Sequence, residues 1–194
     1  MILTSCMIQD RLRDYSNAPC KMGRLVRDGK YHRIIRGLYE TDLDTPGEYL
    51  AQSIYSPSYL SFEFALARWG LIPETVFSFT SATAGKRRSK TYSTSFGTFT
   101  YRDIPEKAFP YGIRYIETDR GGYWIAGPEK ALCDKVYSLH PVHSLKAMRD
   151  LLFEDLRIDE DLFCETDQAL LDDLSERYGS TNVRLLRRVR EGGL

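Results

Sequence analysis

Residues 76–126 contain a succession of short segments in which β-branched and aromatic residues alternate with polar residues. The segments read VFSFTSAT, TYSTSF, TFTYRDI, GIRYIET and YWIA, and turn residues lie between them, including Gly97 and the run Asp119-Arg120-Gly121-Gly122. This alternation is typical of strands with one buried face. Because amphipathic helix patterns precede and follow the region, the sequence predicts an α+β fold with a mixed antiparallel β-sheet and helix domain over residues 43–140.

Helices are predicted in the sequence on both sides of this sheet. In SYLSFEFALARWGLIPE, Ser61 is a suitable N-cap and Gly70 a suitable end, and the apolar residues between them recur at helical spacing. In GPEKALCDKVYSL, a proline at the first helical position and a glutamate in the first turn predict a helix from Pro128. A shorter helix, EYLAQSIY, is expected to pack on the amino-terminal residues.

The last part of the chain, residues 141–194, is predicted to be helical and to pack on the preceding domain. Three amphipathic segments have apolar stripes that include Leu145, Met148 and Leu152; Leu162, Leu170, Leu171 and Leu174; and Val183, Leu186 and Val189. Residues 150–173 contain ten acids and one arginine, whereas residues 177–190 contain five arginines and no acid. These opposite charges either complement each other within the chain or offer one face to a partner.

The first 42 residues have the element order of a winged helix-turn-helix domain. The spacing of Ile8, Leu12 and Tyr15 predicts a short helix, and a second helix begins at Asn17 or Ala18. A left-handed glycine, Gly29, is suited to end it, and YHRII and LYET then predict a β-hairpin joined at Arg36-Gly37. In such a domain the second helix enters the major groove of DNA, and the hairpin lies along the backbone or in the minor groove.

The charge of this region bears on the same interpretation. The 194-residue chain has no net charge, but residues 11–40 contain eight lysines or arginines against three acids. The pattern also fits a helical hairpin whose basic side is only solvated. A solvated face more often mixes both signs, however, and no acid lies between Gly29 and Leu38. The basic segment is therefore predicted to contact nucleic acid.

Several kinds of chemistry have no support in the sequence. It contains no glycine-rich phosphate loop, no HExxH and no GxSxG, and its three histidines have no evident nucleophile to activate. The four cysteines lack zinc-ligand spacing and suit a reducing cytoplasm. No apolar run is long enough to span a membrane, and no secretory signal is predicted. We therefore expect no catalytic residue, no metal and no cofactor.

Four motifs, RLVRDGKYHRIIRGLYETD, SYLSFEFALARWGLIP, FGTFTYRDIP and WIAGPEKALCDKVYSL, follow one another over about residues 20–140. In this order and spacing they resemble the AbiEi family of antitoxins from type IV toxin–antitoxin systems. The resemblance implies a winged helix that represses the protein's own operon by binding inverted repeats. It also implies a carboxy-terminal part that counteracts a nucleotidyltransferase-like toxin, AbiEii, without a lasting tight complex.

Carried onto this chain, the resemblance implies DNA-contacting residues on the second helix and on the hairpin. They are Lys21, Arg24 and Arg27 on the helix and Lys30, His32, Arg33 and Arg36 on the hairpin. The implied partners are operator DNA, bound by two copies of the chain, and an AbiEii-type toxin, countered directly or indirectly. A full winged helix usually has one more helix before these two, for which only residues 1–7 remain.

Two other functions are compatible with the same residues. One is a protein-interaction module in which the basic hairpin meets an acidic partner. The other is a metal-dependent nuclease or nucleotidyltransferase that uses the segment rich in aspartate and glutamate. A gel shift of operator DNA, recovery of a protein partner, and metal-dependent turnover distinguish the three.

Overall fold

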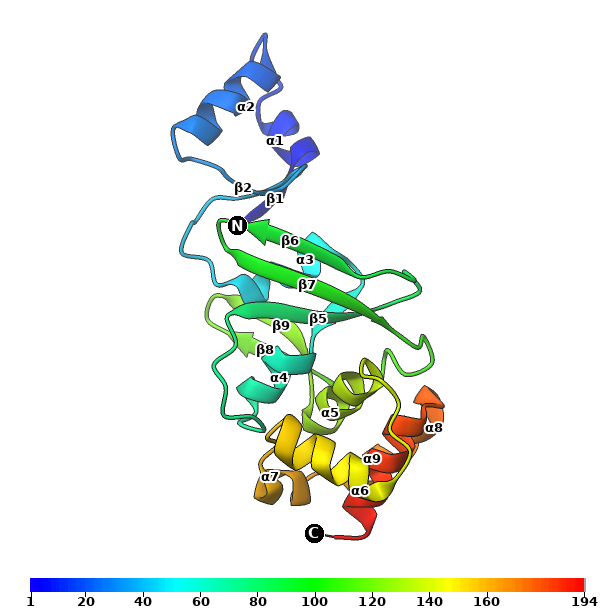
Figure 1. The fold of residues 1–194 in the computed structure, drawn as a ribbon. Coiled ribbons are helices and arrows are strands. Elements are labelled where there is room, and N and C mark those ends of the chain that lie inside the picture. The colour runs from blue at the N-terminus through cyan, green and yellow to red at the C-terminus, as the bar shows by residue number, and fades with distance from the viewer. Residues whose placement is uncertain (194) are drawn as a thin grey trace.

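A six-stranded mixed β-sheet lies at the centre of the computed structural model, which describes residues 1–193 (Figure 1). In spatial order its strands are β6 (Lys90–Thr94), β7 (Gly97–Ile104), β5 (Ser78–Ala84), β4 (Ser58–Leu60), β9 (Gly121–Ala126) and β8 (Ile113–Thr118). Strands β5 to β9 coincide with the five alternating segments of the sequence. The predicted α+β class is therefore confirmed.

The pairing of these strands is less regular than an antiparallel sheet. Strand β4 runs parallel to β9, and β5 runs parallel to β7, whereas the other neighbours are antiparallel. Strand β4 was not predicted. All three of its residues are buried, so it lacks the alternation that marks a half-exposed strand. This short strand joins the two halves of the sheet.

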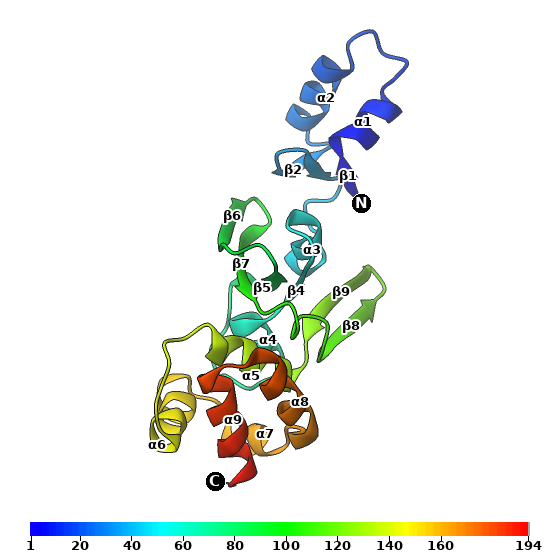
Figure 2. The ribbon, with the colours of Figure 1, turned by 90° about the vertical axis from the view of Figure 1, so that its right-hand side faces the viewer.

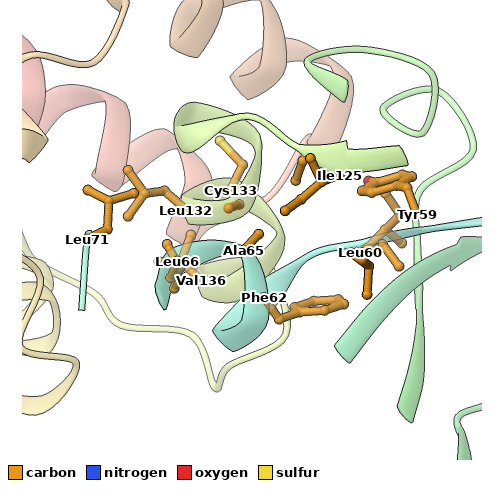
Figure 3. Close-up of a cluster of buried hydrophobic side chains, with 14 of the residues drawn as sticks. Tyr59, Leu60, Phe62, Ala65, Leu66, Leu71, Ile125, Leu132, Cys133 and Val136 are labelled. Carbon is orange, nitrogen blue, oxygen red and sulfur yellow. The ribbon is translucent and has the colours of Figure 1, made fainter. Parts of the chain in front are cut away.

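Two helices pack beside the sheet and build the main hydrophobic core. They are α4 (Phe62–Arg68), which follows β4 directly, and α5 (Pro128–Tyr137), which follows β9. Figure 3 shows Leu66 and Val136 of these helices facing each other in the core, with Leu60 and Ile125 of the strands nearby. Helix α4 ends as predicted at Gly70, which has a positive φ of 76°.

The carboxy-terminal helices form the end of the molecule beyond α5. They are α6 (Leu145–Arg149), which continues into the π-helical segment η2 (Asp150–Asp155), then α7 (Glu160–Cys164), α8 (Gln168–Tyr178) and α9 (Thr181–Glu191). The second predicted helix is in fact two, because the Asp167 side chain caps a new helix by accepting the amide protons of Ala169 and Leu170. The predicted apolar stripes are buried or half-buried.

Residues 1–40 form a module that projects from the opposite end of the molecule (Figures 1 and 2). We call it the amino-terminal module. Its elements are β1 (Ile2–Thr4), α1 (Ser5–Arg11), α2 (Ala18–Arg27), β2 (His32–Ile35) and β3 (Leu38–Glu40), and its strands form an antiparallel sheet in the order β1-β3-β2. Strand β1 was not predicted. Helix α1 is also shorter than the sequence indicated, and Tyr15 lies beyond it, exposed.

The module is joined to the large sheet by a 3-10 turn, η1 (Gly47–Tyr49), and a short helix, α3 (Ala51–Ile54). These two elements replace the single helix predicted here. Leu50 and Ile54 belong to the same hydrophobic cluster as Ile34 and Leu38 of the hairpin, in line with the expected packing. Among residues 1–193, no helix has both the length and the apolar composition needed to cross a membrane.

Candidate nucleic-acid interface

Helix α2 has an apolar side and a basic side. Its apolar residues pack on the small core of the module: Ala18, Met22, Leu25 and Val26 contact the cluster of Leu3, Ile8, Leu12 and Tyr39. Arg24 and Arg27 lie on the other side of the helix and are exposed. Lys21 is half-buried, and its ammonium group lies 5.2 Å from the centre of the Tyr15 ring. The predicted apolar stripe is therefore confirmed.

Both ends of α2 are fixed by local interactions that the sequence predicted. The Asn17 side chain caps the start of the helix by accepting the amide proton of Cys20 at 3.1 Å. At the other end Gly29 has a positive φ of 68°, and the amide of Lys30 donates to the Leu25 carbonyl at 2.9 Å. The helix ends abruptly here, and Lys30, which is exposed, lies just beyond its carboxy-terminal end, close in sequence to Arg27.

The hairpin that follows distributes its basic residues over two faces. Arg33 pairs across the strands with Tyr39, whose ring packs under the helices, so Arg33 lies on the helix-facing side of the small sheet. His32 pairs with Glu40 and lies on the opposite side, which faces the large sheet. Arg33 is exposed, whereas His32 is half-buried and Glu40 is buried. The structure thus separates His32 from the other predicted residues.

The turn of the hairpin lies beside the first helix. Gly37 has a φ of 87°, as predicted, and its carbonyl accepts the amide proton of Ser5 at 2.9 Å. Arg36, next to it, is exposed. The turn therefore holds Arg36 at the β1–α1 corner, at the other end of β2 from Lys30.

None of the seven predicted basic residues forms an ion pair with a carboxylate within residues 1–193. Five of them are exposed, namely Arg24, Arg27, Lys30, Arg33 and Arg36. Four of these five, all except Arg36, follow one another along α2, its end and the adjoining edge of the sheet. We call these four residues, Arg24, Arg27, Lys30 and Arg33, the basic face.

One residue of this surface was missed in the sequence. Gly23 lies in the interior of α2 on its exposed side, and a Cβ built on it would have no atom within 4 Å. Its φ is not in the left-handed region, so the fold requires no glycine at this place. A glycine inside a helix costs about 1 kcal/mol relative to alanine. A glycine in the interior of a predicted helix was the signal available in the sequence.

A second cluster of ionisable residues is buried inside residues 43–193, which we call the large domain. The Asp134 carboxylate accepts hydrogen bonds from Tyr59 at 3.0 Å, from Ser61 at 2.5 Å and from Tyr178. The Lys130 ammonium lies 3.5 Å from the same carboxylate and donates to the Tyr178 hydroxyl and the Ala108 carbonyl. Lys130 and Asp134 are both 0 % exposed. The network is enclosed by protein and ties β4, α5 and α8 together.

This buried network accounts for polar residues in two of the sequence motifs, SYLSFEFALARWGLIP and WIAGPEKALCDKVYSL. Ser61 lies at the N-cap position of α4, as predicted, but its hydroxyl bonds Asp134 instead of capping the helix. Burial, with the nearby Asp134 carboxylate, raises the pKa of Tyr59 and Tyr178, which keeps both phenols protonated as donors. The motifs SYLSFE and PEKALCDK therefore belong together because they build one buried polar cluster.

Comparison with known proteins identifies no family. No protein-family model and no curated protein matches the chain. A crystal structure of the RV2827C protein from Mycobacterium tuberculosis aligns with a TM-score of 0.48 and 15 % sequence identity, over 97 % of this chain and 76 % of that chain. A likeness this distant carries no argument about this protein.

Proposed function

We propose that residues 1–42 form a winged helix-turn-helix domain that binds double-stranded DNA. The order β1, α1, α2, β2, β3 and the sheet order β1-β3-β2 support this, with α2 as the recognition helix and the β2–β3 hairpin as the wing. The observation that carries the proposal is the basic face, whose four cations are exposed and have no carboxylate partner among the described residues. Cations of this kind neutralise phosphates.

The residues of the proposed interface have different roles. Arg24, in the exposed middle of α2, is our candidate for a bidentate contact to guanine, which is worth about 1–3 kcal/mol of discrimination. Lys30, Arg33 and Arg36 hold phosphates and set the register of the helix in the groove. We assign no DNA contact to His32, because its side of the small sheet faces the large domain.

We further propose that the protein is a non-enzymatic antitoxin and autorepressor of the AbiEi type, acting in the cytoplasm. The basis is the resemblance of the four motifs, which include the hairpin of the basic face. In this proposal two copies bind an inverted repeat through their amino-terminal modules. The part that follows, residues 45–194, counteracts a nucleotidyltransferase-like toxin.

The proposed binding is dominated by electrostatics and therefore depends on salt. Each neutralised phosphate lowers the slope of log K against log salt concentration by about 0.9. Four to five contacts per copy predict a slope of roughly −4 per module. A module with few base contacts binds weakly alone, so specific operator binding requires two copies on one site.

The test is a gel shift of the DNA upstream of the gene with an R24A/R27A double variant. We expect the shift to disappear while the circular dichroism spectrum stays native, because both side chains are exposed. The matched control is R184A/R188A, which removes the same charge from exposed positions on α9 at the other end of the molecule. This control should shift the DNA as the wild type does.

Two outcomes would contradict the proposal. If R24A/R27A shifts the fragment at the wild-type protein concentration, the basic face is not the DNA-binding surface. If no fragment binds at moderate salt and a pull-down recovers a protein through the hairpin, the module is a protein-interaction module.

A further inference from the structure

Residues 85–90, which we call the basic loop, join β5 to β6 at one edge of the large sheet. The loop reads GKRRSK, and four of its residues are cations, Lys86, Arg87, Arg88 and Lys90. The two arginines are exposed, and the two lysines are half-buried. No acid occurs in the sequence between Glu74 and Asp103, so no neighbour along the chain offsets this positive charge.

Two acids lie beside the basic loop in the structure, and neither forms an ion pair with its cations. The Asp103 carboxylate accepts the backbone amide protons of Lys86 at 3.1 Å and Arg87 at 2.8 Å. Glu106 lies against Gly85 at the start of the loop. Within residues 1–193, none of the four cations has a carboxylate partner. The loop thus shares this property with the basic face.

The backbone of the basic loop is fixed by contacts with the sheet. Asp103 also accepts the hydroxyl proton of Thr83 at 3.0 Å, so its carboxylate joins the end of β5, the loop and β7. Within the loop, Arg87 has a positive φ of 53°, which is unfavourable for a residue with a side chain. Strained positions of this kind are concentrated at functional sites. The contacts of Asp103 therefore fix the backbone from which the two guanidinium groups project.

The basic loop lies at the end of the large domain that adjoins the amino-terminal module. Strand β6, which follows the loop, contacts β2 of the module. The Lys86 ammonium lies 5.3 Å from the centre of the Tyr55 ring, and Tyr55 directly follows α3. Helix α3 in turn packs on the hairpin of the module. Figure 2 shows β6 close to the module, whereas the carboxy-terminal helices lie at the far end of the molecule.

We propose that the basic loop, in the shape held by Asp103, binds phosphates of the same DNA duplex as the amino-terminal module. This inference rests on the proposed DNA binding and extends it to the large domain. One helical turn of DNA is about 34 Å long, so a duplex docked on the module continues past it over adjoining surfaces. Guanidinium groups match the geometry of a phosphate, and such contacts add affinity without sequence information.

The test is hydroxyl-radical footprinting on the DNA upstream of the gene, which maps contacts with the sugar–phosphate backbone nucleotide by nucleotide. At saturating protein, R87A/R88A should lose protection at one set of positions and keep the rest of the wild-type footprint. The matched control is again R184A/R188A, which removes the same charge from exposed positions on α9. This control should give the wild-type footprint.

Fluorescence anisotropy on the same fragment measures the size of the effect. R87A/R88A should weaken binding by about tenfold and make the salt slope shallower by about 1.8 per copy, since each arginine neutralises one phosphate in the proposed complex. R87K/R88K keeps both charges and should therefore keep the wild-type salt slope.

A third variant tests the shape of the loop separately from its charge. D103A keeps all four cations but removes the acceptor that holds the backbone amides of Lys86 and Arg87. Charge alone would make this more positive protein bind DNA more tightly. We expect instead that D103A loses the same set of protected positions as R87A/R88A. Circular dichroism checks that both variants are folded.

Two results would overturn the proposal. The first is a wild-type footprint and salt slope for R87A/R88A, which would make the basic loop an ordinary solvated surface. The second is a wild-type footprint for folded D103A. Neither result changes the gel shift of the wild type or of R24A/R27A, so failure of the loop is distinguishable from failure of DNA binding by the module.

Discussion

The amino-terminal module and the large domain use charge in opposite ways. In the large domain outside the basic loop, charged groups are joined to each other. Glu63 pairs with Lys135 at 2.7 Å and with Arg102 at 3.1 Å, and Asp134 accepts three hydrogen bonds and pairs with Lys130. In the module, the cations of the basic face are exposed and unpaired within residues 1–193. Charge stabilises the fold in one region and remains available to a partner in the other.

The largest effect on stability is expected for D134A. Removing the carboxylate leaves Lys130 as a buried charge without its partner, which is expected to cost about 3–5 kcal/mol in the free energy of unfolding. R24A/R27A should change stability by less than about 0.5 kcal/mol, because surface changes of this kind are nearly neutral. Urea denaturation measures both, and D172A serves as an exposed-carboxylate control. If D134A and R24A/R27A lose a similar amount of unfolding free energy, the two regions do not differ in how charge contributes to stability.

A smaller effect is expected within the module, from two neighbouring residues. R33A should weaken DNA binding by about tenfold and make the salt slope shallower by about 0.9, since Arg33 neutralises one phosphate in the proposed complex. H32A should leave both quantities unchanged, because His32 lies on the other side of the small sheet. Titrations by fluorescence anisotropy at several salt concentrations measure both. Equal effects of the two changes would show that the faces of the hairpin are not distinguished by DNA.

The paired charges of the large domain should also appear in the dependence of stability on pH. Burial alone would raise the pKa of Glu63, but the hydrogen bond and charge of Lys135 outweigh it, and the pKa lies below its ordinary value of 4.5. The stabilisation is therefore present above pH 4.5 and is lost as pH falls through the lowered pKa. E63Q should flatten the acid limb of the stability profile, by about 1 kcal/mol.

The control for this measurement is E160Q, an exposed acid at the start of α7. It should keep the wild-type acid limb. If E63Q and E160Q have the same profile, the Glu63–Lys135 pair does not stabilise the fold.

The smallest expected effect separates stability from binding at one position. G23A should stabilise the protein by about 0.5–1 kcal/mol, because alanine is the better helix former and has open space at this site. If the backbone of α2 approaches DNA closely here, the same change should weaken the gel shift. Thermal denaturation and anisotropy on one sample measure the two effects. A more stable variant with unchanged DNA affinity would show that the helix keeps its distance at Gly23.

Local features of the fold followed well from the sequence. The positions of Gly29, Gly37 and Gly70 were predicted because a positive φ is a property of single residues and their neighbours. The stripe on α2 was predicted because helical spacing identifies a buried side without knowledge of what covers it.

Features that depend on residues far apart in the chain could not be predicted from the sequence. Strand β4 and the parallel pairs around it are defined by neighbours far along the chain. The Asp134 network joins residues up to 75 positions apart, which no local pattern reveals. In the candidate site, alternation along a strand implies that His32 and Arg33 point to opposite sides. Which side remains open is decided only by the packing of the hairpin on the large domain.

That packing also bears on how two copies of the molecule would be arranged on DNA. Ile34 and Leu38 of the hairpin belong to the same hydrophobic core as the large domain. The amino-terminal module is therefore packed on the rest of the molecule. Two copies seated on an inverted repeat would therefore hold their far ends at an angle fixed by the helical phase of the two half-sites. Inserting base pairs between the half-sites would rotate those ends around the duplex axis.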